Sequence, residues 1–71
     1  MDSIYPILCQ ELDKIGITVS YLAMALNITE DSVCSKLRGE SPWMLSEALS
    51  VCKLLNFSDI KLLFLQLDNN S

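Results

Sequence analysis

The part of the sequence that most constrains the fold is residues 18–38, TVSYLAMALNITEDSVCSKLR, which has the pattern of two short helices joined by a tight turn. Apolar residues at positions 19, 22, 23 and 26 have the spacing of one helix face. Asn27 can end this helix because it tolerates the left-handed backbone conformation, and Thr29 can cap the next helix with its hydroxyl. Val33 and Leu37, four residues apart, are expected to point inward together. The sequence therefore predicts a helix-turn-helix.

A first helix is expected to precede this stretch, from about residue 6 to residue 15. Pro6 is acceptable in a first helical turn, where its missing N–H does no harm. Leu8, Leu12 and Ile15 form the predicted core stripe of this helix. Gly16 is expected to end it.

A further helix is predicted over residues 45–55. Leu45, Leu49 and Cys52 form its predicted inner stripe, which is widened by Ala48, Val51 and Leu55. Met44 stands where a capping Ser or Thr would be expected, so the start of the helix is predicted to be poorly capped. Trp43, just before it, is interpreted as packing against the core, with an exposed binding anchor as the alternative.

The last predicted helix covers residues 59–67, with Ser58 as its cap. Ile60, Leu63 and Leu67 lie on its inner face, and Phe64 shares that face. Further leucines lie off the face, so the helix is apolar nearly all round. Such a helix is usually buried on more than one side. It is therefore expected to be a deeply buried core helix or to form a dimer or partner contact.

Three segments, LAMALNITEDSVCSKLRG, LSEALSVCKLLN and DIKLLF, together resemble the Cro/repressor type of helix-turn-helix domain found in phage regulators. The resemblance covers roughly residues 8–64. It implies an all-α fold, a compact five-helix bundle with a helix-turn-helix, as in lambda-repressor-like DNA-binding domains. The matching positions outside the LSEAL segment are Leu22, Ala23, Leu26, Ile28, Thr29, Val33, Leu37 and Gly39. These residues imply the architecture and not, by themselves, DNA binding.

The chain departs from this family at the positions where DNA contacts usually lie. Val19 stands where Gln is usual, and Met24 and Ala25 stand where Lys is common. Asp31 replaces a small polar or basic residue, and Glu40 stands where Lys is frequent. Basic or amide groups are thus replaced by apolar or acidic ones, which favours contacts with a protein.

The composition bounds the function further. The chain has 71 residues, which predicts a single domain, with residues 1–3 and 68–71 expected to be flexible. Hydrophobic residues make up 51% of it, so either the core is dense or apolar surface is reserved for a partner. The net charge is −4, whereas DNA-binding domains are usually basic because phosphate neutralisation supplies much of their affinity. Such a chain suits a basic partner, unless the charge serves only solubility.

The sequence offers no catalytic or metal-binding set. Cys9, Cys34 and Cys52 form no CxxC pair and there is no His, which excludes the common zinc spacings and a His base. The cysteines are therefore expected to be free thiols, with Cys9 and Cys52 buried, in a reducing bacterial cytoplasm. No signal peptide and no membrane-spanning run is expected. We expect neither an enzyme nor a cofactor.

The first candidate functional site is an apolar helix face beside acidic residues. Its members are Tyr21, Met24, Ala25, Glu30, Asp31 and Glu40. An apolar centre with an acidic rim fits a basic protein surface. The favoured hypothesis is an antirepressor, which binds a basic repressor and blocks its operator binding. The simpler interpretation is that neighbouring helices cover Tyr21 and Met24.

The competing site would bind operator DNA directly. Lys36 or Arg38 would contact phosphates, and Ser32 or Ser35 would touch base edges. Two basic residues are few for this purpose. A homodimer would double them across paired half-sites, as helix-turn-helix repressors do.

Overall fold

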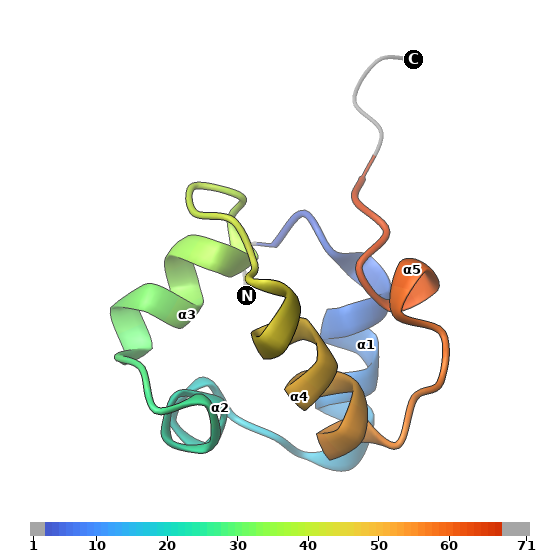
Figure 1. The fold of residues 1–71 in the computed structure, drawn as a ribbon, viewed down its shortest axis with the longest axis horizontal. Coiled ribbons are helices and arrows are strands. Elements are labelled where there is room, and N and C mark those ends of the chain that lie inside the picture. The colour runs from blue at the N-terminus through green and yellow to red at the C-terminus, as the bar shows by residue number, and fades with distance from the viewer. Residues whose placement is uncertain (1–2, 68–71) are drawn as a thin grey trace.

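The computed structural model describes residues 3–67, which form five helices and, within that range, no strand (Figure 1). The helices are α1 (Pro6–Ile15), α2 (Val19–Leu26), α3 (Glu30–Leu37), α4 (Leu45–Leu55) and α5 (Ile60–Leu63). This confirms the all-α prediction. Of the ends expected to be flexible, residues 1–2 and 68–71 lie outside the described residues. Ser3 is half-buried, and its Oγ accepts a hydrogen bond from the Tyr5 N–H at 3.0 Å.

The helices surround one hydrophobic core. In Figure 1, α4 crosses the centre of the view, with α2 and α3 on one side of it and α5 on the other. α1 packs against both α4 and α5, and α2 packs against α3. The most deeply buried large side chains come from all five helices: Leu8, Leu12, Leu22, Val33, Leu37, Val51 and Leu63.

Local backbone chemistry defines the turn between α2 and α3. The Thr18 hydroxyl accepts from the Tyr21 N–H at 3.1 Å, and the Thr29 hydroxyl accepts from the Ser32 N–H at 3.1 Å, so each helix has a side-chain cap. Asn27 ends α2 in the left-handed conformation, with φ of 59°. The predicted boundaries of both helices are confirmed.

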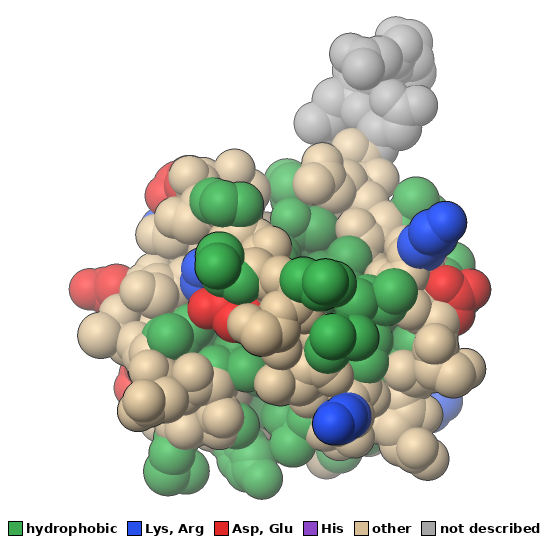
Figure 2. Space-filling view, in the orientation of Figure 1, with side chains coloured by type: hydrophobic (Ala, Val, Ile, Leu, Met, Phe, Trp, Pro, Cys, Tyr) green, Lys and Arg blue, Asp and Glu red, His purple; other side chains and the backbone are tan. Residues whose placement is uncertain are grey.

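The predicted inner face of α4 was partly wrong. Leu45 and Leu49 are 71% and 47% exposed, whereas the other predicted members are buried: Ala48, Val51, Cys52 and Leu55. Both sets have helical spacing, so periodicity alone did not decide which faces inward. Figure 2 shows hydrophobic side chains gathered over α4 and between α4 and α5.

The end of α1 also differs from the prediction. Ile15 was expected in the core but is 53% exposed. Gly16 follows in the left-handed conformation and turns the chain back, so that the N–H of Ile17 donates to the Leu12 carbonyl at 2.9 Å. Ile17 then packs against the core. The next apolar residue along the chain therefore takes the place expected for Ile15.

The last helix is shorter than predicted. α5 ends at Leu63, and beyond it the Leu67 N–H donates to the Ile4 carbonyl at 2.7 Å. This bond to the N-terminal segment draws the chain out of the helix and leaves Leu67 51% exposed. The cap is Asp59, whose carboxylate accepts from the Leu62 N–H at 3.1 Å, and not Ser58.

Trp43 packs inside a cluster of three aromatic rings. Its ring centroid lies 5.2 Å from that of Phe64 and 6.5 Å from that of Tyr5, both in edge-on contact. Its indole Nε1 is buried without a hydrogen-bond partner. The interpretation of Trp43 as a core-packing residue is confirmed.

Candidate functional site

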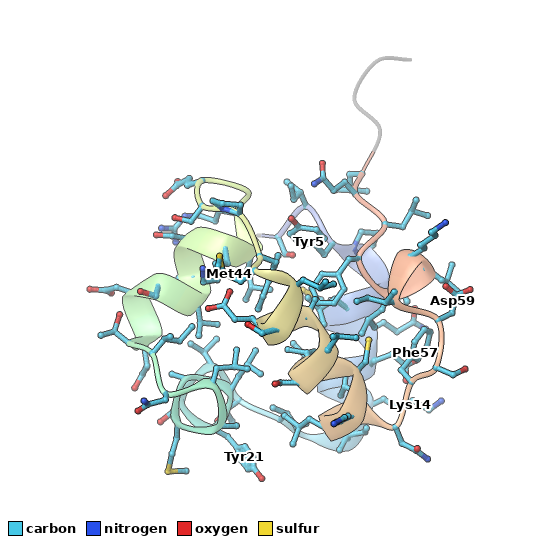
Figure 3. The ribbon with its side chains drawn as sticks, viewed as in Figure 1. Tyr5, Lys14, Tyr21, Met44, Phe57 and Asp59 are labelled. Atoms are coloured by element: carbon cyan, nitrogen blue, oxygen red, sulfur yellow. The ribbon has the colours of Figure 1, made fainter. Side chains whose placement is uncertain are left out.

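The outer side of α2 exposes an apolar face. Met24 is 74% exposed, Tyr21 is 44% exposed, and Ala25 is exposed beside them. Leu22 and Ala23, on the other side of the same helix, are buried. Figure 3 shows the Tyr21 side chain pointing away from the molecule. The interpretation that neighbouring helices cover Tyr21 and Met24 was therefore wrong.

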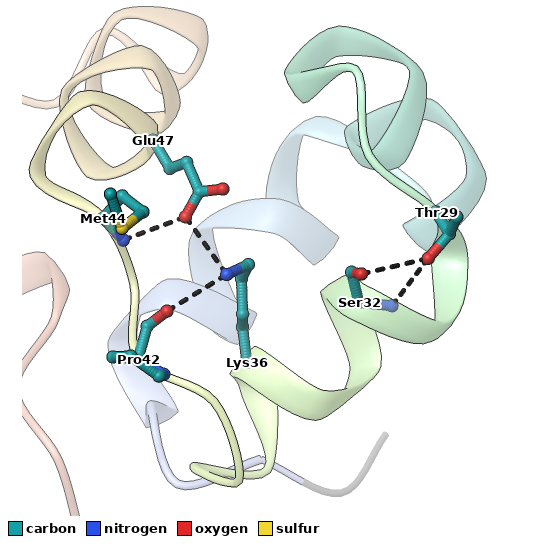
Figure 4. A network of polar contacts seen from close by, with 6 residues as sticks. All are labelled: Thr29, Ser32, Lys36, Pro42, Met44 and Glu47. Atoms are coloured by element: carbon teal, nitrogen blue, oxygen red, sulfur yellow. Dashed lines mark hydrogen bonds and ion pairs between the residues drawn. The ribbon is translucent and has the colours of Figure 1, made fainter.

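Two carboxylates lie at the start of α3, the helix that packs against α2. Glu30 and Asp31 occupy the first turn of α3 and are both exposed. Negative charge is favourable there because it faces the positive end of the helix dipole. The Thr29 hydroxyl also donates to the Ser32 hydroxyl at 3.0 Å, which reinforces the helix start (Figure 4). The short turn thus holds two acidic groups next to the end of α2.

The third predicted acidic residue is already paired. Arg38 donates from Nε to one Glu40 carboxylate oxygen at 3.0 Å and from Nη2 to the other at 3.2 Å. This pair is exposed, at 43% for the Arg38 side chain and 60% for that of Glu40. The hydrogen bonds and charge of Arg38 hold the pKa of Glu40 below its ordinary value. Glu40 therefore brings less free negative charge to the site than the sequence suggests.

Removing the guanidinium should change the titration of this carboxyl. In an Arg38→Ala variant we expect the pKa of Glu40 to rise toward its ordinary value, as followed by NMR of its side-chain carbonyl. Because the folded-state pKa is the lowered one, the pair stabilises the fold above the unfolded-state pKa. That contribution is lost as the pH falls through the folded-state pKa. Arg38→Lys, which keeps the charge but not the two parallel hydrogen bonds of the guanidinium, should give an intermediate value. If the pKa of Glu40 is unchanged in Arg38→Ala, Arg38 is not the cause of its lowered value.

Lys36, a predicted phosphate contact, points into the structure. Its side chain is only 13% exposed, and its Nζ lies 3.2 Å from Oε1 of Glu47 and donates to the Pro42 carbonyl at 3.0 Å (Figure 4). The same Glu47 oxygen accepts from the Met44 N–H at 2.9 Å. This bond serves the Met44 N–H, whereas the Met44 side chain makes no cap hydrogen bond to the start of α4. Lys36 therefore ties α3 to the start of α4.

The predicted DNA-contacting residues do not form an exposed basic patch. Ser32 and Ser35 are half-buried, and the Ser35 carbonyl accepts from the Glu40 N–H at 2.9 Å. Of this set only Arg38 is well exposed, and it faces Glu40. The four residues thus lie together along α3. Both of their positive charges are paired with carboxylates, Lys36 with Glu47 and Arg38 with Glu40.

A hollow between α2 and α4 extends the apolar face. Its lining residues are Ala25, Leu26, Ser50, Lys53 and Leu54. This hollow was not predicted, because nothing in the sequence shows that residue 25 lies near residues 50–54. In this hollow the exposed Lys53 lies close to Ala25.

The cysteines do not make a reactive site. All three are free thiols; Cys52 is buried, whereas Cys9, expected to be buried, is half-buried. Burial and the nearby negative charge of Asp59 raise the pKa of Cys52, which keeps its thiol protonated. Among residues 3–67 no three His, Cys, Asp or Glu side chains are grouped to hold a metal ion. Within the same range no helix has the length and hydrophobicity to cross a membrane.

The described chain is thus a small all-helical protein with an exposed apolar face on α2 and two exposed carboxylates in the first turn of α3. Comparisons with known protein families, with curated proteins and with solved structures give no match for this chain. The exposed face of α2 and the first turn of α3 are therefore the features from which a function can be inferred.

Proposed function

We propose that this protein is a helix-turn-helix antirepressor of the Cro/repressor type. It would bind the basic DNA-contacting surface of a repressor through its α2–α3 face, which we define as Tyr21, Met24, Ala25, Glu30 and Asp31. In this position it blocks operator binding by the repressor. The observation that carries the proposal is the 74% exposure of Met24, on the helix next to the acidic first turn of α3.

The helix-turn-helix assignment is supported by the caps and the turn. Thr18 and Thr29 cap the two helices, and Asn27 supplies the left-handed residue between them. α2 and α3 pack against each other. These features are what the resemblance to Cro/repressor domains implies for the sequence of residues 18–38.

The chemistry of the face favours a basic protein over DNA. An apolar centre gains from burial against another protein, and methionine adapts its shape to such contacts. Glu30 and Asp31 attract lysine and arginine side chains but repel phosphates. DNA would also have to compete with Glu40 for Arg38 and with Glu47 for Lys36.

The second candidate function is direct operator binding by a homodimer through Ser32, Ser35, Lys36 and Arg38. The exposure of Arg38 near the end of α3 favours it, because an exposed guanidinium can exchange a carboxylate for a phosphate. It ranks second because the described part of α2 and α3 has no other well-exposed cation.

The two functions make opposite predictions for the same variants. We expect Met24→Lys and Asp31→Ser each to weaken displacement of a basic Cro/repressor-type DNA-binding domain from its operator duplex by roughly tenfold, about 1.4 kcal/mol. If the chain reads DNA itself, the same substitutions should strengthen DNA binding. Fluorescence anisotropy of labelled duplex, measured with and without the repressor domain, follows both results.

The matched controls make the same chemical changes elsewhere. Ile15→Lys adds a lysine at an exposed apolar position on α1, and Asp13→Ser removes an exposed carboxylate there. Both should behave as wild type. Direct binding of wild-type protein to duplex at ~50 mM salt, with log affinity falling by about 0.9 per phosphate against log salt, would contradict the antirepressor proposal.

A further inference from the structure

The end of α4 carries a lysine that borders two mostly apolar hollows. Lys53 is exposed, in the last turn of α4, and it lines both hollows. The other residues that line the first hollow are Leu49, Cys52, Asn56, Phe57 and Ser58. The second hollow, between α2 and α4, is otherwise lined by Ala25, Leu26, Ser50 and Leu54. The two hollows therefore meet at one positive charge.

The ends of two helices give these hollows their shape. Asn56 ends α4 in the left-handed conformation, and the Phe57 N–H donates to the Cys52 carbonyl at 2.9 Å, which holds Phe57 beside α4 (Figure 3). α2 ends in the same conformation at Asn27, directly after Leu26, which lines the second hollow. Because local hydrogen bonds fix both helix ends, the walls of the hollows are in place before a partner binds.

Lys53 has no carboxylate partner among the described residues. The two carboxylates nearest to it along the chain are engaged elsewhere. Glu47 pairs with Lys36. The Asp59 carboxylate accepts from the Leu62 N–H at 3.1 Å. The charge of Lys53 is therefore free to pair with a carboxylate of another molecule.

We infer that Lys53 and these two hollows bind an acidic amphipathic helix of another protein. A carboxylate of that helix pairs with Lys53, and the large apolar side chains on either side of the carboxylate enter the two hollows. A helix presents such a row on one face, because residues three and four positions apart lie side by side. This partner has the opposite charge to the repressor proposed for the α2–α3 face, so the inference goes beyond the proposed function and does not depend on it.

The size of the hollows favours anchoring side chains over a free small molecule. Their volumes are about 250 and 340 Å³, near the lower end of the range of about 300–1,000 Å³ for pockets that hold drug-sized ligands. Two small recesses that meet at one charge suit two apolar side chains of one segment. Burial of these side chains supplies most of the affinity, since an exposed ion pair contributes little. The charge of Lys53 selects which segments bind.

The test uses the full chain and two labelled helical peptides. Each peptide is rich in alanine and carries two leucines on one face, with a glutamate between them in the first peptide and a lysine in the second. In fluorescence anisotropy we expect the glutamate peptide to bind with a Kd on the order of 0.1 mM and the lysine peptide at least about tenfold more weakly. In NMR spectra the glutamate peptide should shift the amide signals of Lys53, Leu54 and Leu26.

Reversal of the charge at residue 53 should exchange the preference for the two peptides. In Lys53→Glu the glutamate peptide should bind at least about tenfold more weakly, because like charges then face each other, and the lysine peptide should bind more tightly than to wild type. Ser50→Phe, which fills the second hollow from an exposed position, should weaken binding of both peptides. The matched control is Lys14→Glu, the same reversal at an exposed lysine in the last turn of α1, which should bind as wild type. Far-UV circular dichroism checks the fold of each variant.

Three results would overturn the inference. The first is equal binding of the two peptides by wild type, or no binding of either up to about 1 mM. The second is a Lys53→Glu variant that keeps the wild-type preference. The third is a change in the amide signal of Lys53 that follows the concentration of this chain alone, which would give the hollows to a second copy. None of these results bears on displacement of a repressor, which is measured separately with the α2–α3 variants.

Discussion

A Leu63→Ala variant should lose about 2–5 kcal/mol of unfolding free energy, the usual cost of truncating a buried leucine. Leu63 is fully buried and is the only fully buried side chain that α5 contributes. α5 has four residues, too few to be a stable helix by itself. Its position therefore depends on Leu63. Because a domain of this size has on the order of 4–10 kcal/mol of stability, the loss would be a large share of the total.

The measurement is denaturation by urea, followed by far-UV circular dichroism and by Trp43 fluorescence. Trp43 contacts Phe64, directly after α5, so its emission reports whether α5 is docked. The matched control is Leu62→Ala, the same truncation one residue earlier at a side chain that is 43% exposed. It should cost much less. Equal losses in the two variants would mean that α5 is not held through Leu63.

The parts of the fold that were predicted correctly depend on local chemistry. Gly16 and Asn27 end helices with positive φ values of 86° and 59°, a conformation that these residue types tolerate better than others. Thr29 accepts from an N–H three residues later. Such features involve residues close together in sequence, so the sequence alone indicates them.

The errors arose where distant residues decide the outcome. The stripe that α4 buries depends on which side α1 and α5 cover, and its sequence is apolar on both sides. The end of α5 depends on the bond from the Leu67 N–H to the Ile4 carbonyl, which joins the two ends of the described chain. Neither contact leaves a periodic signal in the sequence.

In the candidate site, too, the features set by nearby residues were predicted and those set by distant residues were not. Tyr21, Met24 and Ala25 were predicted to be exposed because their spacing puts them on a different face of the helix from its inner stripe, and the structure places them outside. The pairing of Lys36 with Glu47 was not predicted, since it joins α3 to α4 across a loop. The sequence therefore indicated the apolar face well but overstated the free charge around it.

Removing the Lys36 ammonium should also destabilise the protein strongly. In Lys36→Met we expect a loss of about 2–3 kcal/mol, below the usual cost of breaking a fully buried ion pair because the two side chains remain 13% and 16% exposed. The variant leaves the Glu47 carboxylate mostly buried and without its cation. Methionine keeps the apolar stem of the lysine, so the loss reports on the charge and not on packing.

A double-mutant cycle tests whether Lys36 and Glu47 stabilise each other. Glu47→Gln keeps a side-chain oxygen for the Met44 N–H, so combining it with Lys36→Met should restore part of the lost stability. The exposed pair of Arg38 and Glu40 is the control, and Arg38→Met should change the free energy of unfolding little. Additive losses in the Lys36 and Glu47 cycle would mean that the two side chains do not stabilise each other.

The role of Lys36 limits how DNA binding by this chain can be tested. If Lys36→Ala loosens the end of α3 and the loop that holds Pro42, it will weaken any contact made by α3, whether the partner is a phosphate or a protein. Arg38→Ala has less of this defect, because Arg38 is exposed and its pair with Glu40 joins residues only two positions apart. A loss of DNA binding in Arg38→Ala with unchanged unfolding would support direct operator binding. The same loss in Lys36→Ala alone would show only that α3 had moved.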